Sequence, residues 1–267
     1  MIYNAKNGCL KISNTDMDYI CFGNGSENLI MIPGVGDGLK TVKGTAVPFA
    51  LMYRKIACKY KIFVFSRRNI LPEGFSTEDM AEDVYTAMEQ LGLRPSYVLG
   101  VSQGGMIAQY LAIRHPEKVK KLVLAVTLAR QNETVQNVIN NWVDMAKAGD
   151  YKGIMLDTAE KSYSEQYGRK MRRMYSLFGG IGKPKSFSRF IVQANACLMH
   201  NAYEELRNIQ CPTLIIGGEE DRIVTGKASE EISRQIRSSK LLMYEGLGHG
   251  AYEEAKDFLD QVAEFCS

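Results

Sequence analysis

The pentapeptide Gly100-Val101-Ser102-Gln103-Gly104 has the residue types of an activated serine nucleophile. An apolar run, Tyr97 to Val101, leads directly into it, and a segment with helical periodicity, Gln103 to Arg114, follows it. A serine on such a tight strand-to-helix turn has a strained backbone, and the flanking glycines avoid collisions with neighbouring elements. The N-terminus of the helix also favours developing negative charge. The pattern therefore predicts nucleophilic attack by the Ser102 hydroxyl, with a passive structural turn as the alternative.

A serine hydroxyl needs a base to take its proton, and the chain contains only three histidines. His115 ends the helix that begins after Ser102, which places it about 18 Å away, so its expected role is to cap that helix. His200 has no neighbouring strand to position it and is either structural or a pocket residue. His249 follows a strand-like run in a glycine-rich loop that can carry an imidazole over the serine. We therefore expect His249 to be the base.

A carboxylate must hold the imidazole in the correct tautomer. The turn after the apolar run Pro212 to Ile216 carries Asp221, 28 residues before His249, which leaves room for one helix and one strand. The order serine, aspartate, histidine along the chain also favours Asp221. Glu219 and Glu220 in the same turn are the alternatives.

The loop Pro33-Gly34-Val35-Gly36 follows another apolar run, Asn28 to Ile32. Attack on a carbonyl produces an alkoxide that needs preorganised N–H donors. Because glycines let backbone N–H groups turn into a cavity, we expect one donor at Val35 and the other at Gln103. A phosphate-binding loop is disfavoured, since no lysine has P-loop spacing and Leu39 occupies the last glycine position of G-x-G-x-x-G.

Eight short apolar runs are the strands expected to position these residues. They alternate with helical patterns, which predicts an α/β fold with a mostly parallel central sheet flanked by helices. Unbroken apolar runs fit a sheet that is buried on both faces. Helices are expected from the cap at Ser76 to Leu91, from Gln103 to Arg114 and from Ala251 to Phe265. The predicted strands are residues 9–12, 19–22, 28–32, 61–65, 97–101, 121–126, 212–216 and 240–244.

The strand signal is missing between about residues 127 and 207, where the chain is helical in character. We predict that residues 127–207 form a helical lid over the carboxyl edge of the sheet, inserted into one core domain made of residues 1–126 and 208–267. Aromatic, Met and His side chains in this insertion are candidates for a substrate pocket, although such side chains in helices are commonly core. The candidates are Trp142, Tyr163, Tyr167, Met171, Met174, Tyr175, Phe178 and His200.

The 267-residue chain has a net charge of only +3, and its basic residues are dispersed among acidic ones. This distribution argues against a nucleic-acid partner, and no apolar stretch is long enough to span a bilayer. The N-terminus lacks a signal-peptide profile, and the six cysteines are scattered without a C-x-x-C pair. We therefore expect a cytoplasmic protein that acts on a small-molecule substrate, with no metal, no organic cofactor, no nucleic acid and no membrane.

Over nearly its whole length the chain resembles the α/β-hydrolase superfamily, and in particular small esterases, 3-oxoadipate enol-lactonases and related lid-bearing hydrolases. The resemblance rests on residues 100–106, 115–119 and 211–218, on the Gly218-x-x-Asp221 turn and on Gly248-His249. It implies an α/β-hydrolase fold, and it implies the roles already expected for the site. These are the roles of Ser102, Asp221 and His249 in catalysis and of Val35 and Gln103 in the oxyanion hole.

Two segments depart from the pattern of these relatives. Pro33-Gly34 stands where His-Gly is common, and Ser66-Arg67-Arg68-Asn69 stands where Asp-x-Arg-Gly is common. Both segments border the expected pocket, so enol-lactonase activity is not carried over to this chain.

The assembled residues favour hydrolysis of a small ester, lactone or thioester through an acyl-enzyme on Ser102, in the carboxylesterase class. The same triad also serves amidases, peptidases, carbon–carbon bond hydrolases and acyltransferases, which stay as alternatives. A ligand-binding or signalling protein that keeps the triad with little turnover is an alternative of a different class.

Overall fold

An eight-stranded sheet with the order β1-β2-β4-β3-β5-β6-β7-β8 forms the centre of the computed structural model, which describes residues 2–178 and 182–267. β2 pairs antiparallel with both β1 and β4, and every pairing from β4 to β8 is parallel. The strands are β1 (Lys6–Ile12), β2 (Thr15–Phe22), β3 (Glu27–Ile32), β4 (Tyr60–Arg68), β5 (Ser96–Val101), β6 (Val119–Ala125), β7 (Thr213–Gly218) and β8 (Ser239–Tyr244).

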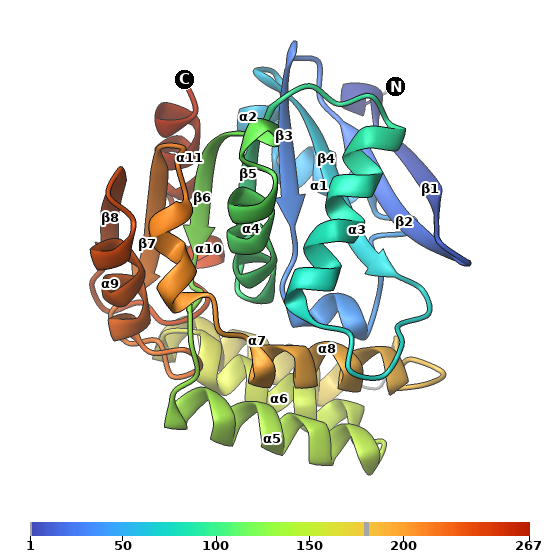
Figure 1. The fold of residues 1–267 in the computed structure, drawn as a ribbon. Helices are drawn as coiled ribbons and strands as arrows, with labels where there is room; N and C mark the ends of the chain where they lie inside the picture. Colours follow the sequence, from blue (N-terminus) through green and yellow to red (C-terminus); the bar gives the residue numbers. More distant parts are fainter. Residues whose placement is uncertain (1, 179–181) are drawn as a thin grey trace.

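Helices cover both faces of this sheet (Figure 1). One face is covered by α3 (Thr77–Gln90), α4 (Gln103–Arg114) and α9 (Gly226–Gln235), and the other by α1 (Ala46–Met52), α2 (Arg54–Ala57), α10 (Ala251–Glu254) and α11 (Phe258–Phe265). Short 3₁₀ turns lie before and between these elements: η1 (Ile2–Asn4), η2 (Val35–Gly38), η3 (Pro116–Lys118) and η4 (Tyr203–Asn208).

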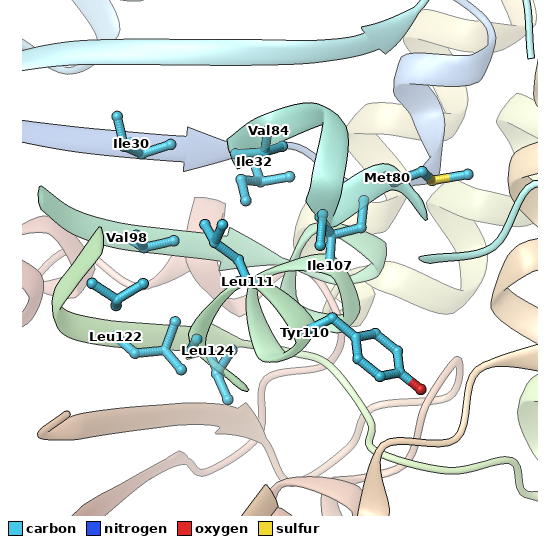
Figure 2. Close-up of a cluster of buried hydrophobic side chains, with 14 of the residues drawn as sticks. Ile30, Ile32, Met80, Val84, Val98, Ile107, Tyr110, Leu111, Leu122 and Leu124 are labelled. Atoms are coloured by element: carbon cyan, nitrogen blue, oxygen red, sulfur yellow. The ribbon is translucent and has the colours of Figure 1, made fainter. Parts of the chain in front are cut away.

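The parallel strands are apolar on both sides because each face of the sheet has its own buried cluster. In β3, Ile30 and Ile32 join the cluster under α3 and α4, whereas Leu29 and Met31 join the cluster on the opposite face. Figure 2 shows the first cluster, in which Leu111 of α4 lies close to the strand side chains. The predicted α/β fold with a mostly parallel sheet flanked by helices is therefore confirmed.

Most of the predicted elements are present, with one correction. All eight strands, α3 and α4 occur where expected, and Ser76 caps α3 by accepting from Asp79 N at 3.0 Å. The single helix predicted over residues 251–265 is wrong, because Ala255 adopts an extended conformation (φ −69°, ψ 118°) and separates α10 from α11. The change of direction lets Ala251 and Phe258 both bury their side chains in the same cluster, which periodicity alone did not reveal.

Between β6 and β7 the chain forms α5 (Glu133–Lys147), α6 (Tyr151–Ser162), α7 (Glu165–Phe178) and α8 (Ser188–Met199). Figure 1 shows these helices at the end of the sheet toward which the arrowheads of β3 and β6 point, which is its carboxyl edge. The division into a core and a lid over residues 127–207 stays a prediction. None of the helices in the described ranges is both long and apolar enough to cross a bilayer.

Candidate active site

The turn between β5 and α4 places Ser102 in a strained conformation. Its backbone has φ 54° and ψ −120°, a region that non-glycine residues rarely occupy. Both flanking glycines are required by space, since a Cβ on Gly100 would lie 2.4 Å from Gly104 O and one on Gly104 would lie 1.8 Å from Ile32 O. The Ser102 N–H donates to Ala125 O at 2.9 Å, which ties the turn to the neighbouring strand β6.

The structure brings together the three side chains that the sequence singled out. His249 comes from the loop after β8 and Asp221 from the turn after β7. His249 Nε2 lies 2.9 Å from Ser102 Oγ, and His249 Nδ1 lies 2.8 Å from Asp221 Oδ2. With Nδ1–H donating to the carboxylate, Nε2 is free to accept the proton of the Ser102 hydroxyl.

Asp221 is held in its ionised form. Its Oδ1 accepts from Ile223 N at 2.8 Å and from Val224 N at 2.9 Å. Burial acts to raise the pKa of Asp221, but the charge of His249 and the hydrogen bonds to the carboxylate outweigh it and hold this pKa below its usual value. The alternative acids Glu219 and Glu220 are exposed.

Two backbone N–H groups near Ser102 are available as oxyanion donors. Val35 begins η2 and Gln103 begins α4, and N–H groups at the start of a helical turn have no acceptor within it. Neither N–H donates to a protein acceptor in the residues that the structure describes. A Cβ on Gly34, the residue before Val35, would lie 3.7 Å from Ser102 Oγ. The arrangement can therefore hold negative charge that develops beside the nucleophile.

A buried guanidinium contacts both segments that carry these donors, and it belongs to the segment Ser66–Asn69, which the sequence places beside the expected pocket without a role for Arg67. Arg67 is only 2% exposed, and its Nη2 donates to Pro33 O and, at 3.0 Å, to Gln103 Oε1. Its Nε and Nη1 have no partner among the described residues, and burial lowers the pKa of Arg67 to about 10 against the opposing charge of Asp37. The sequence signal for a buried arginine here was a pair of adjacent arginines at the end of an apolar strand. The second of them, Arg68, forms an ion pair with Asp83 of α3.

Helix α8 directly contacts the turn η2, which begins at Val35. Arg189 of α8 forms an ion pair with Asp37 of η2 and donates to Arg67 O at 2.8 Å. A Cβ on Gly38 would lie 2.6 Å from Phe190 Cα, so the helix backbone packs against the turn without a gap. Helix α8 and η2 are thus one packed unit in this structure.

Replacement of Arg67 by Met is expected to lower kcat by about 10- to 100-fold with little change in KM, because small displacements of positioned donors are costly. Stability should fall little, since the change removes two unpaired buried N–H groups. The measurement is kcat and KM with the thermal unfolding midpoint. Arg68→Met, which breaks the ion pair with Asp83, is the matched control: it should lower the midpoint and leave kcat unchanged. A folded Arg67→Met variant with normal kcat contradicts the positioning role.

Two of the candidate pocket residues, Trp142 and His200, have buried side chains with partners of their own. Trp142 is 3% exposed within the core of the insertion and donates from Nε1 to Asp157 Oδ2 at 2.6 Å. His200 is 2% exposed and lies with its ring edge-on to Tyr110. Of the two readings that the sequence left open for Trp142 and His200, the contacts of both side chains fit the packing role.

Five further pocket candidates lie on α7: Tyr167, Met171, Met174, Tyr175 and Phe178. Tyr175 is half-buried there, and the Phe178 side chain lies outside the described residues.

His200 is held neutral by its partners. Its Nε2 lies 3.2 Å from Gln109 Oε1, an acceptor, and its Nδ1 lies 2.9 Å from the Thr77 hydroxyl, which can donate. One proton on Nε2 satisfies both contacts, and burial lowers the pKa of His200 to about 3.

As the pH is lowered below about 6.5, His200 is expected to reduce the free energy of unfolding by about 1.4 kcal/mol for each pH unit. The reason is that His200 binds a proton in the unfolded chain but not in the folded chain. Urea unfolding at pH 7, 6 and 5 measures this slope. His200→Gln, which has no group that takes up a proton in this range, should remove the contribution. Equal slopes in wild type and His200→Gln would show that His200 is not the group responsible.

The chain is similar in sequence to known proteins over most of its length. A model of the alpha/beta hydrolase fold family matches residues 54–256. The chain is 27% identical over 246 residues to the putative non-heme bromoperoxidase BpoC of Mycobacterium tuberculosis, covering 85% of this chain and 88% of that protein.

Two solved structures have the same fold. The alpha/beta hydrolase MGS-M2 from a deep-sea metagenome library superposes with a TM-score of 0.86 at 20% identity, covering 97% of this chain and 96% of the other. The enol-lactonase of Burkholderia xenovorans superposes with a TM-score of 0.81 at 15% identity, covering 97% and 99%. Since the family model spans most of the chain and the fold agrees throughout, this protein belongs to the alpha/beta hydrolase fold family.

Proposed function

We propose that the protein is a serine hydrolase that cleaves a small ester, lactone or thioester through an acyl-enzyme on Ser102. The observation that supports this most strongly is the continuous hydrogen-bonded chain from Asp221 through His249 to Ser102 Oγ. Membership of the family supports an enzyme of the hydrolase class, since its relatives and structural neighbours include a proline iminopeptidase, an enol-lactonase and an esterase.

In the acylation half of the proposed reaction, Ser102 Oγ attacks the substrate carbonyl carbon as His249 Nε2 takes the hydroxyl proton. The N–H groups of Val35 and Gln103 donate to the resulting oxyanion, and Asp221 stabilises the imidazolium. When the tetrahedral intermediate collapses, the bond to the leaving oxygen or sulfur breaks and His249 transfers its proton to that atom.

In the deacylation half, a water molecule attacks the acyl carbon while His249 Nε2 takes one of its protons. Collapse of the second intermediate breaks the bond to Ser102 Oγ, which recovers the proton from His249. The product acid leaves, and the enzyme is returned to its starting state.

The test is detection of the acyl-enzyme. Rapid mixing with a p-nitrophenyl ester should release a burst of p-nitrophenolate equal to the enzyme concentration wherever deacylation is the slower step. Mass spectrometry of the acid-quenched enzyme should find the acyl group on the peptide that contains Ser102, and Ser102→Ala should show neither signal. Absence of Ser102-dependent turnover across esters, lactones and thioesters would overturn the proposal and favour the ligand-binding alternative.

A further inference from the structure

A cavity of about 210 Å³ lies beside the Ser102 turn, on the face of the sheet that α1 and α10 cover. It adjoins the nucleophile turn without being lined by Ser102 itself: Pro33, Gly34 and Val101 line it, and a Cβ on Gly34 would lie 3.7 Å from Ser102 Oγ. We refer to this cavity as the inner chamber. Its other lining residues are Met31, Ile32, Phe49, Met52, Tyr53, Val64, Leu99, Tyr252 and Glu253.

The inner chamber is suited to an apolar group. Its strand side is formed by Met31, Val64 and Leu99, which are buried in the core. Burial raises the pKa of the Tyr53 phenol to about 12, so this group stays neutral. No lysine or arginine lines the chamber, and its one carboxylate, Glu253, would repel an anion. An acyl group that carries its own carboxylate is therefore disfavoured here.

The position of His249 indicates which part of an ester the inner chamber holds. The leaving alcohol must lie against His249 Nε2 to receive its proton. Gly34, next to the expected donor Val35, lines the chamber, whereas the side chains of Ser102, Asp221 and His249 lie outside its lining. We infer that the inner chamber binds the acyl group, and that the substrate is an ester or thioester of an uncharged, apolar acid. This inference rests on the proposed function.

A second cavity of about 500 Å³ lies on the surface beyond the inner chamber, and we call it the outer groove. Apolar side chains of α1 and α11 line it together with the cations Arg54, Lys55 and Lys256. It shares Met52, Tyr53, Tyr252 and Glu253 with the inner chamber, so these four residues form the boundary between the two. Met52 is 65% exposed and its neighbour Leu51 is 46% exposed, which leaves an apolar rim on α1. Met side chains are flexible, so a linear chain can displace Met52 and pass from chamber to groove.

The two volumes predict a dependence on acyl length. A cavity of about 150 Å³ can hold benzene, so the inner chamber by itself suits acyl groups of about benzoyl or hexanoyl size. Longer linear chains must pass Met52 and continue into the outer groove.

The experiment measures kcat/KM for p-nitrophenyl acetate, butyrate, hexanoate and octanoate. For wild type we expect a rise of about two- to four-fold per methylene up to hexanoate, the upper figure corresponding to complete burial of each methylene. The p-nitrophenyl monoester of adipic acid, which has the hexanoyl length with a terminal carboxylate, should react at least ~10-fold more slowly than the hexanoate.

The boundary is tested with Met52→Trp, which should lower the ratio of octanoate to acetate kcat/KM by about 10-fold. Met199→Trp is the matched control, because Met199 is 54% exposed at the end of α8 and lines neither cavity; its ratio should equal that of wild type.

Three results overturn the inference: a flat acyl-length profile, faster turnover of the adipate monoester than of the hexanoate, or an unchanged ratio in Met52→Trp. In each of these cases Ser102-dependent ester turnover is still seen, so the proposed function survives. Loss of all Ser102-dependent turnover would instead overturn the proposed function together with the inference.

Discussion

Replacement of Ser102 or of His249 by alanine is expected to lower kcat on an accepted ester by about 10⁶-fold, and replacement of both is expected to cost no more than either alone. The reason is that the two side chains act as one unit through the 2.9 Å contact between His249 Nε2 and Ser102 Oγ. Once the nucleophile is lost, the base has no proton to accept. The measurement is kcat at saturating ester for both single variants and the double variant.

His115→Ala is the matched control for the histidine substitution. His115 stacks on Tyr85 and contacts Glu82 at the end of α4, so its removal should leave kcat unchanged. If the two losses in kcat multiplied in the double variant, Ser102 and His249 would not be acting as one unit. A His249→Ala variant that keeps most of its activity would show that another group is the base.

Asp221→Asn is expected to lower kcat by about 10⁴-fold while the protein stays folded. The backbone N–H groups of Ile223 and Val224 both point at Oδ1, so the asparagine will keep its carbonyl oxygen there and turn its NH₂ toward His249 Nδ1. That contact requires Nδ1 without a proton. It therefore places the proton on Nε2, which can no longer accept from Ser102.

The measurement is kcat from pH 6 to 9 with the unfolding midpoint. Asp221 has a pKa below its usual 3.8, so the stability from its ionised form is present above pH ~4 and is lost only as the pH falls through that lower value; the assay range avoids this effect. Glu220→Gln, an exposed neighbour, is the control and should retain full activity. A loss in Glu220→Gln as large as in Asp221→Asn would show that the acid is misassigned.

The parts of this site that could be predicted from the sequence are those encoded by local pattern. The strand-to-helix turn around Ser102 needs glycine on both sides, and the structure shows the collisions that any Cβ there would cause. His249 and Asp221 could be chosen because each follows an apolar run, and parallel strands bring their carboxyl ends to one edge of the sheet.

The parts that could not be predicted depend on contacts between distant segments. The sequence placed Trp142 and His200 in a stretch of helical character, but such a pattern does not say whether a side chain meets substrate or core. Helix α1 was not among the predicted elements; Pro48 lies in its first turn, where a proline is tolerated. The inner chamber, one wall of which is α1, was therefore not predicted either.

By itself, the sequence determined the α/β-hydrolase fold, the strained nucleophile turn and the order of the residues that meet at the sheet edge, because each depends on strand and turn signals within about ten residues. Only the tertiary structure decided that Arg67 joins Pro33 to Gln103, that Arg189 of the insertion pairs with Asp37, and that an apolar chamber opens beside Gly34. These features arise from side chains that are brought together by the order of strands in the sheet. No local pattern records which distant residues will become neighbours.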